Sequence, residues 1–562
     1  MGENSNLFGI WDYIVLLAVL LVSSGIGIYY RFTGGKQRTV KEYLLADSNL
    51  HVVPVAFSLV ATAMSAITLL GISSESYTFG LQYIVQNITH VFCTPIVTYV
   101  YLPVFYQLRV TSVYEYLEKR FGKTTRLAAS LTYSFQMILY SGIVLYAPAL
   151  TLGTVTGISQ NVAILSVGLI CTFYSTIGGM KAVVMADLLQ SVLMFGAVLS
   201  VIICGVVQTG SVAEIWRIAD EGNRTGLLNF DIDPTVRHSW FSLIIGGGIT
   251  FLSAFAINQS QIQKYLTVKD LKSAQQTIWL NLPIFVILSL STSLSGLAIF
   301  SKYYQCDPIA NKSITSSDQL MPYYVLDSMG HIPGLSGFFV AGIFSGSLST
   351  ISTSMNCLAA VSLEDYLKPL YSLGVKESKL SDQKLSLYTK IITFSYGLVC
   401  ICIAFLSQSM GGIYQAALTV LGVVGGPHLG LFSLGMFTKT ANEKGAMTGL
   451  ILGLTLSTWM GFGEPRPPPS KLPVRVDGCG GITNISLPLV EKITERDYFW
   501  LYRLSYLYNG ALGLICTFTV GFVASKISNK VSMAKPGNLD PNLFVPLVTR
   551  FSKKGEQNNG TV

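Results

Sequence analysis

Serine and threonine side chains cluster in apolar stretches of this sequence where a lipid-facing helix would carry aliphatic residues. One cluster occupies residues 58–71, and a denser one occupies residues 345–356. A hard cation such as sodium takes several oxygen ligands at once and accepts neutral ones. The adjacent hydroxyls of Ser349 and Thr350, facing carbonyls freed by a break in residues 58–71, would supply such a set. Packing serines are the alternative, although packing alone explains the density of the second cluster poorly.

A further stretch, residues 246–261, combines three consecutive glycines with polar side chains. Thr250 and Ser253 follow the glycines, and the stretch ends in Asn258-Gln-Ser-Gln261. An opened helical turn frees carbonyls for a cation and amides for an anion. This stretch and residues 58–71 begin two consecutive groups of five apolar spans, and broken helices in matching positions of inverted repeats indicate a transporter binding site. Tight helix packing by small residues is the alternative.

An acidic residue, Asp187, lies near the inner end of the sixth apolar span. A carboxylate within a membrane is costly, so we interpret it as a functional candidate. The alternative is an interfacial residue that reaches water or pairs with Lys181.

Several kinds of chemistry are not indicated by the sequence. The five histidines are scattered without metal-ligand spacing, and the chain contains no phosphate-binding P-loop, no GxSxG elbow and no HExxH motif. We therefore expect no enzyme activity and no cofactor. Without a nucleotide site, active transport must draw on an ion gradient.

The elements that carry these residues are membrane spans. Of 562 residues, 51% are hydrophobic and 12% are charged, whereas a soluble domain carries roughly 25% charged residues. Long apolar stretches, near or above the roughly 20 residues that cross a bilayer, alternate with short charged segments. The sequence predicts an all-α polytopic membrane protein with about 13 transmembrane helices. The expected spans are 11–30, 52–79, 82–106, 127–150, 161–179, 183–207, 240–263, 275–301, 336–362, 387–407, 413–437, 445–462 and 500–525.

The distribution of Lys and Arg predicts the orientation of these spans. With the N-terminus outside, seven cytoplasmic segments hold 26 of the 37 basic residues. Such an excess is typical of cytoplasmic loops and accounts for the net charge of +8 without a nucleic-acid partner. We expect a plasma-membrane protein with an extracellular N-terminus and a cytoplasmic C-terminus. The cytoplasmic segments are 31–51, 107–126, 180–182, 264–274, 363–390, 438–444 and 526–562.

The order of the spans divides the chain into six expected regions. They are the N-terminal end, first helix and cytoplasmic loop (1–51), the first inverted repeat (52–207), an extracellular loop (208–239), the second inverted repeat (240–437), the last two spans (438–525) with a Pro-rich extracellular loop (463–499), and a cytoplasmic tail (526–562).

The expected outer loops carry marks of an extracellular location. Glycosylation sequons begin at Asn223, Asn311 and Asn484. Cys306 and Cys479 are the two cysteines in these loops, and a disulfide between them would join loop 302–335 to loop 463–499. Two free thiols are the alternative.

These residues resemble the sodium/solute symporter family, in particular the branch of sodium-coupled monocarboxylate, multivitamin and iodide transporters. The resemblance covers residues 10 to 460 or so and implies a leucine-transporter-type fold of two inverted five-helix repeats that works by alternating access. The similar segments are Ser65-Ala-Ile-Thr-Leu-Leu-Gly71, Ser74-Glu-Ser-Tyr77, Thr111-Ser-Val-Tyr-Glu-Tyr-Leu117, Gly142-Ile-Val-Leu-Tyr-Ala-Pro-Ala149, Gly178-Gly-Met-Lys-Ala-Val183, Asn258-Gln-Ser-Gln-Ile-Gln263 and Gly346-Ser-Leu-Ser-Thr350.

The resemblance also implies two places for sodium, the coupling ion. At matching positions, the shared sodium site has the carbonyls of Ala61 and Met64 with the hydroxyls of Ser349 and Thr350. An acidic residue matches Asp187 in members that use more than one sodium. The second site implied by this match comprises Asp187, Gln190, Ser352 and Thr353.

The substrate implied by the resemblance is a small organic anion, such as lactate, pyruvate or a short-chain fatty acid. Thr68 replaces a glutamine of the iodide transporter, which argues against iodide. Ala63 replaces a phenylalanine usual in this branch and could enlarge the pocket for a vitamin such as biotin or pantothenate. No arginine lies mid-span to pair with a carboxylate. The candidate substrate contacts are Thr62, Thr68, Tyr146, Ser253, Gln259 and Gln415.

Electrical work favours more than one sodium per cycle. Moving one charge across a membrane is worth ~2.3 kcal/mol per 100 mV. A monovalent anion carried with one sodium gains nothing from this potential, whereas a second sodium makes the cycle net positive. We expect at least two sodium ions per anion.

The function predicted from these observations is a sodium-coupled monocarboxylate symporter, and a multivitamin symporter is the first alternative. A sensor or sodium leak on the same scaffold is the alternative of another class.

Overall fold

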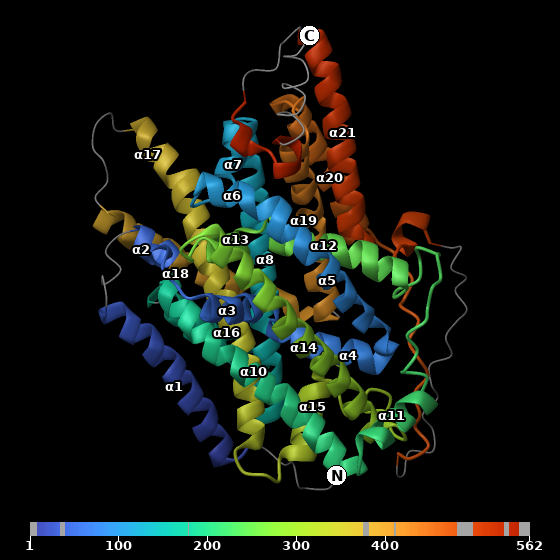
Figure 1. Ribbon diagram of the computed structural model, residues 1–562. Coiled ribbons are helices and arrows are strands. Elements are labelled where there is room, and N and C mark those ends of the chain that lie inside the picture. Colours follow the sequence, from blue (N-terminus) through green and yellow to red (C-terminus); the bar gives the residue numbers. More distant parts are fainter. Residues whose placement is uncertain are drawn as a thin grey trace.

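The computed structural model describes the greater part of the chain (Figure 1). The described residues are 8–33, 40–177, 179–374, 382–409, 412–479, 498–532 and 539–549. Within these ranges the regular structure is helical, with a single isolated β-bridge between Leu50 and Val268. The expected all-α class is therefore confirmed.

Ten of the described helices, or continuous helical runs, are long and apolar enough to cross a membrane, and a shorter apolar helix, α9 (Gln160–Ile177), accompanies them. With two bent helix pairs the described residues give up to 12 such spans, and the shorter α9 occupies the place of the remaining span of the 13 or so that hydropathy predicts. The ten are α1 (Ile10–Phe32), the run through α5 (Gln86–Ile96) and α6 (Leu102–Leu108), α8 (Lys123–Thr156), α10 (Met180–Thr209), α14 (Leu271–Tyr303), α16 (Leu335–Val361) with the turns after it, α18 (Asp382–Leu406), α19 (Ile413–Phe437), α20 (Glu443–Phe462) and α21 (Tyr508–Ser532).

The first bent pair consists of α3 (Val52–Ala63) and α4 (Ala66–Phe79), whose axes differ by 60°. Met64 leaves the helical conformation with φ −96° and ψ 81°. Ser65 then caps α4, because its side chain accepts a hydrogen bond from the backbone amide of Thr68 at 3.4 Å. The hydroxyl-rich stretch 58–71 is therefore a broken helix, as predicted.

The second bent pair consists of α12 (Gly247–Ala256) and α13 (Gln259–Tyr265). A π-helical turn, Ser242–Gly246, precedes α12, and the whole segment bends by 52° before α13. Asn258 caps α13 by accepting a hydrogen bond from the amide of Ser260 at 2.9 Å. This break was also predicted from the sequence.

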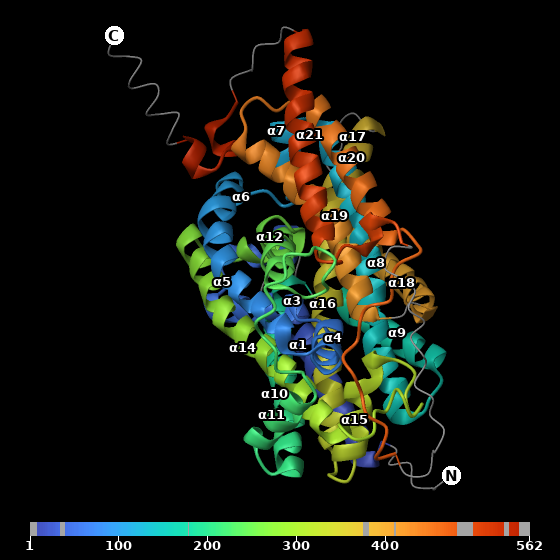
Figure 2. The same ribbon diagram turned by 90° about the vertical axis from the view of Figure 1, so that its right-hand side faces the viewer.

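Helix α16 lies in the middle of the bundle and is buried along almost its whole length (Figures 1 and 2). It packs against α10, α8, α3 and α1. A Cβ atom on Gly346 would lie 3.0 Å from the amide nitrogen of Ala66 and 3.2 Å from the carbonyl carbon of Ser65. Glycine at this position therefore lets α16 approach the break between α3 and α4 closely.

Four short helices mark the two ends of the bundle (Figures 1 and 2). Helices α7 (Glu115–Arg120) and α17 (Lys368–Gly374) lie at one end, towards which α21 extends. Helices α11 (Val212–Glu221) and α15 (Leu320–Met329) lie at the opposite end. Another short helix, α2 (Val40–Leu45), follows α1.

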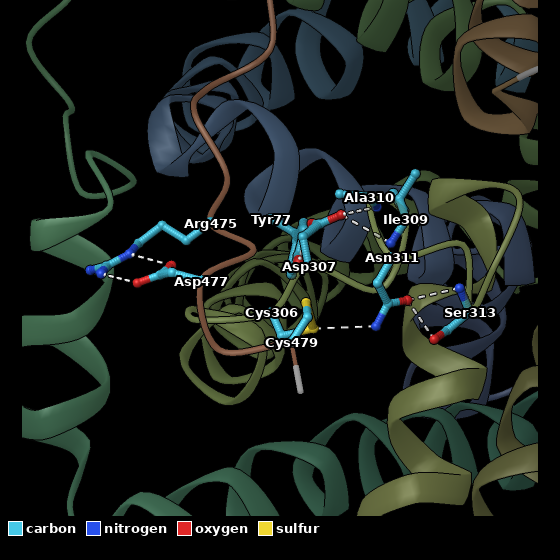
Figure 3. Close-up of a disulfide and its surroundings, with 10 residues drawn as sticks. All are labelled: Tyr77, Cys306, Asp307, Ile309, Ala310, Asn311, Ser313, Arg475, Asp477 and Cys479. Atoms are coloured by element: carbon cyan, nitrogen blue, oxygen red, sulfur yellow. Dashed lines mark hydrogen bonds and ion pairs between the residues drawn. A yellow bond between two sulfur atoms is a disulfide. The ribbon is translucent and has the colours of Figure 1, made fainter. Parts of the chain in front are cut away.

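A disulfide joins Cys306 and Cys479, with 5.1 Å between their Cα atoms (Figure 3). Close by, Asp307 accepts a hydrogen bond from the hydroxyl of Tyr77 at 2.6 Å, and its amide donates to the carbonyl of Arg475 at 3.0 Å. The predicted disulfide is therefore confirmed, and it anchors the Pro-rich loop to α4 and α14.

Candidate functional site

A cavity of about 150 Å³ lies between the two broken helices. It is polar near the breaks and aromatic on the side of α12 and α14, where His90 stacks on Phe251 with 4.7 Å between ring centroids. Two predicted substrate contacts, Thr62 and Thr68, line it. Further lining residues come from the hydroxyl- and amide-rich stretches that the sequence singled out, among them Ser65, Asn258, Ser260, Gln261 and Ser354. The lining residues that the sequence did not indicate include Tyr83, Gln86, His90, Tyr140, Phe251, Phe255, Phe285, Ser289 and Tyr414.

Two other predicted contacts, Ser253 and Gln259, are held away from this cavity. The hydroxyl of Ser253 donates to the carbonyl of Thr250 at 2.9 Å. The side-chain oxygen of Gln259 accepts from the amide of Val113, and its nitrogen donates to the carbonyl of Thr111, both at 2.8 Å. Gln259 thereby fastens the start of α13 to the loop before α7.

The predicted shared sodium site lies where α16 passes the end of α3. Ala61, Met64, Ser349 and Thr350 are all buried there. The hydroxyl of Thr350 donates to the carbonyls of Thr62 at 3.3 Å and Gly346 at 3.0 Å. The hydroxyl of Ser349 has no hydrogen-bond partner among the described residues. A buried hydroxyl without such a partner, next to a residue whose hydroxyl reaches a carbonyl at a helix break, fits a hard cation.

The predicted second sodium site lies deeper, between α10, α3 and α16. The hydroxyl of Ser58 donates to Asp187 Oδ2 at 2.5 Å. The hydroxyl of Ser352 donates to the carbonyl of Ser349 at 3.1 Å, and that of Thr353 lies 3.3 Å from the Thr62 hydroxyl. The side-chain nitrogen and oxygen of Gln190 are buried and have no partner in the described structure.

Sequence reasoning missed a lysine in this region, Lys264 on α13. Its Nζ lies 2.9 Å from Asp187 Oδ2 and donates to the carbonyl of Ser58 at 3.0 Å and to the hydroxyl of Thr62. The side chains of Lys264 and Asp187 are both fully buried. Asp187 Oδ1, in contrast, has no partner within the described residues. Hydropathy predicts a cytoplasmic loop at Lys264. Its position one helical turn after Ser260 and Gln261 was the signal in the sequence that could have placed it near the broken helix.

Two broken helices that bring hydroxyls, freed carbonyls and a buried carboxylate together form the centre of a cation-coupled transporter. The sequence model of the sodium:solute symporter family matches residues 43–453, which is well over half of the chain. The chain belongs to the sodium:solute symporter family. This membership confirms the resemblance found in the sequence, and it makes the protein a sodium-coupled symporter rather than an enzyme.

Relatives of the symporter include proteins named as multivitamin transporters and proteins named as monocarboxylate transporters. The chain is 51% identical to a putative sodium-dependent multivitamin transporter of Drosophila melanogaster over 522 residues, 92% of this chain and 86% of that protein. It is 41% identical to the human sodium-coupled monocarboxylate transporter 1 over 559 residues, 96% of this chain and 90% of that protein.

Solved structures resemble the symporter in fold. A substrate-bound, outward-open sodium-coupled sialic acid symporter matches with a TM-score of 0.76 at 24% identity, covering 95% of this chain and all of that one. A nucleobase-cation-symport-1 family transporter matches with a TM-score of 0.54 at 10% identity, covering 89% of this chain and 96% of that one. At such identities the likeness concerns the fold alone, and it confirms the expected leucine-transporter type.

The remaining predicted contacts, Tyr146 and Gln415, lie towards the disulfide end of the symporter. Tyr146 accepts a hydrogen bond from the Gln160 side chain at 2.7 Å. The side-chain oxygen of Gln415 accepts from Arg237 Nη1 at 2.9 Å and faces a vestibule of about 1220 Å³. Gln415 therefore belongs to this vestibule rather than to the central cavity.

Residues of the vestibule wall contact residues of the central cavity, since the ring centroid of His238 lies 5.4 Å from that of Tyr83. The hydroxyls of Tyr83 and Tyr414, which line the cavity, are hydrogen-bonded to each other. Beside them, Arg237 donates to both carboxylate oxygens of Glu75, from Nη2 at 2.6 Å and from Nε at 3.2 Å. The described residues that line the vestibule include three arginines, Arg237 among them, and no carboxylate.

Proposed function

We propose that this symporter imports a small monocarboxylate by alternating access, with at least two sodium ions per anion. The observation that carries the proposal is the 150 Å³ cavity between the broken helices. Pockets for drug-sized ligands enclose about 300–1,000 Å³, so the size of this cavity favours an anion such as lactate, pyruvate or a short-chain fatty acid.

The two groups of oxygen atoms near the cavity support a stoichiometry above one. Ser349 and Thr350, with the carbonyls of Ala61 and Met64, would bind one sodium ion. Asp187, with Gln190, Ser352 and Thr353, would contribute to binding another. Two sodium ions per monovalent anion make the cycle net positive inward, so a membrane potential of 100 mV adds ~2.3 kcal/mol to the driving force.

The proposed location is the plasma membrane, with the vestibule outside. Asn223 lies on the vestibule wall, and Asn311 lies beside the disulfide (Figure 3). We propose both as glycosylation sites, because a disulfide and sequons at one end of the molecule suit the extracellular side. Asn484, the third sequon, lies outside the described residues.

A multivitamin symporter is the second candidate, favoured by the 51% identity to a relative of that name. Ala63 lines the cavity, where a small side chain leaves space for a longer substrate. Biotin and pantothenate share a carboxylate with lactate and butyrate, so both candidates require an anion site beside the sodium sites.

Electrophysiology tests the proposal directly. Cells that express the symporter are exposed to lactate, butyrate, pyruvate, biotin, pantothenate and iodide, first in sodium and then in choline medium. We expect an inward current with a small monocarboxylate in sodium only, and Ser349→Ala should weaken its sodium dependence. A current with biotin or pantothenate alone would favour the second candidate. Radiolabelled uptake separates the remaining cases, because saturable sodium-dependent accumulation excludes a sensor or a leak.

A further inference from the structure

The central cavity has no charged side chain among its lining residues in the described structure. An anion that leaves water for such a site loses its hydration and needs an opposite charge or several donors in return. Hydroxyls and amides of the lining, including Thr68 and Gln261, offer hydrogen bonds but no charge. A positively charged group in contact with the lining could therefore supply the charge that a bound anion needs.

The ammonium group of Lys264 is a positive charge in contact with the lining of the cavity. Its Nζ donates to the hydroxyl of Thr62, and Thr62 lines the cavity. Lys264 follows Ser260 and Gln261 by one turn of α13, and both of these residues also line the cavity. Residues three and four positions apart share a helix face. A lysine carries its charge on a flexible four-carbon stem, so rotamer changes alone move Nζ by several ångströms.

The partner of Lys264 retains unused capacity for a second cation. Asp187 Oδ2 accepts from Ser58 and Lys264, but the buried Oδ1 has no partner in the described part of the chain. The side-chain amide of Gln190, also on α10 and one turn further on, is likewise unpaired. Buried polar atoms are rarely left unpaired, and a place for a bound ion is one of the few explanations for them.

We propose that Lys264 exchanges partners during transport: sodium replaces its ammonium at Asp187, and the freed ammonium pairs with the carboxylate of the anion in the cavity. The inference rests on the proposed import of a carboxylate anion. Lys264 would then be the positive charge that pairs with the substrate, a role for which the sequence offers no arginine in the middle of a span.

The exchange explains coupling through charge balance in a dry interior. Without ligands, Asp187 and Lys264 neutralise each other. With both ligands bound, sodium neutralises Asp187 and the anion neutralises Lys264. Either ligand alone leaves one buried charge unpaired, which is costly. Each ligand therefore raises the affinity for the other, and thermodynamic linkage requires the two effects to be equal.

The first test compares Lys264→Gln with Lys302→Gln in cells. Lys302 also pairs with an aspartate, Asp327 at 2.5 Å, but at the partly exposed outer end of α14. The substrate is butyrate or pantothenate, whichever carboxylate the wild type transports. We expect Lys264→Gln to raise the half-saturating anion concentration about tenfold or more, because a hydrogen-bonded charge is lost. It should also lower the sodium concentration that half-saturates charge movement without substrate, because the competitor is gone, and Lys302→Gln should change neither value.

The second test uses Asp187→Asn, which frees Lys264 without sodium. We expect the half-saturating anion concentration to become nearly independent of sodium in the range that controls it in the wild type. If Asp187 only bound sodium and did not hold Lys264, Asp187→Asn would instead weaken anion binding at every sodium concentration. Surface labelling shows which variants reach the membrane, and Lys264→Arg, which keeps the charge, should bind the anion better than Lys264→Gln.

The outcomes separate the inference from the function on which it rests. If the wild type transports no carboxylate in sodium medium, the proposed function fails and the inference falls with it. If the wild type does so, unchanged anion and sodium half-saturation in Lys264→Gln overturns the inference alone. A uniform loss of anion affinity in Asp187→Asn also overturns it, and this second result decides where Lys264→Gln does not reach the surface.

Discussion

Two ion pairs lie close to residues that line the central cavity, and they are satisfied to different degrees. In the outer pair, Arg237 donates to both oxygens of Glu75 and also to Gln415. In the inner pair, Lys264 contacts one oxygen of Asp187 and leaves the other without a partner in the described structure. The outer side chains are 17% and 8% exposed, whereas both inner side chains are 0% exposed. The better-paired carboxylate therefore lies where water is nearer.

The difference follows the chemistry of the two cations. Guanidinium is a planar fork that matches both carboxylate oxygens and stacks on aromatic rings, and Arg237 lies 4.2 Å from the Phe79 ring and 4.8 Å from that of Tyr506. Ammonium is a compact charge on a flexible stem. The outer pair is thus suited to hold a barrier closed, and the inner pair to release its partner.

The largest effect should come from Asp187→Leu, which leaves the Lys264 ammonium buried without its partner. Breaking a buried pair on one side costs about 3–5 kcal/mol. We expect a marked loss of thermal stability in detergent and little protein at the cell surface. Asp187→Leu combined with Lys264→Met should recover most of the stability but not sodium-coupled uptake. If Asp187→Leu alone were as stable as the wild type, the inner pair would not be a buried, stabilising pair.

Arg237→Gln should have a smaller effect on stability, because its partner Glu75 lies next to the vestibule. The lost charged hydrogen bonds are worth about 1.5–3 kcal/mol. We expect a substrate-independent sodium current, since the barrier beside Tyr83 and Tyr414 is weakened, while the half-saturating anion concentration changes little. Thermal unfolding and current recordings measure both effects. Equal destabilisation by Arg237→Gln and Asp187→Leu would contradict the distinction between the pairs.

Tyr414→Phe sharpens the comparison by removing one hydroxyl from the barrier and no charge. A neutral hydrogen bond contributes about 1 kcal/mol. Without it the barrier opens more readily, so we expect a thiol reagent to label Ser65→Cys in the cavity about fivefold faster. Tyr116→Phe is the control, because its hydroxyl donates to the carbonyl of Leu543 at the opposite end. Equal labelling in wild type and Tyr414→Phe would show that the tyrosine pair does not limit access.

The smallest effect concerns His238, which lies 3.6 Å from Glu75 and 3.2 Å from the Tyr506 hydroxyl. Burial lowers the pKa of its imidazole well below the usual range, and Arg237 adds to the effect. The unfolded chain binds this proton below about pH 6.5 and the folded protein does not, so stability falls as the pH drops through that value. His238→Gln should flatten this dependence in thermal unfolding, whereas His331→Gln, at an exposed position, should not. An unchanged slope in His238→Gln would show that this proton does not contribute.

Much of the fold followed from local features of the sequence. The length of apolar runs determined the membrane spans, because a bilayer imposes the same requirement on each helix independently. Hydroxyls and glycines marked both broken helices for a similar reason, since capping and weakened helix propensity act within a few residues. Cys306 and Cys479 could be paired because few cysteines lie in outer loops.

Contacts between spans were decided by the tertiary structure alone. Lys264 and Asp187 are 77 positions apart, and hydropathy assigned the lysine to a loop because it treats every charge as solvated. Gln259 and Gln415 were predicted to bind substrate on the basis of the family resemblance, but their partners, Val113 and Arg237, come from distant segments. A side chain's type limits what it can bind, whereas the packing of other helices determines which partner it meets. The sequence by itself therefore determined a sodium-coupled transporter with two broken helices, and only the tertiary structure placed a lysine at its buried carboxylate.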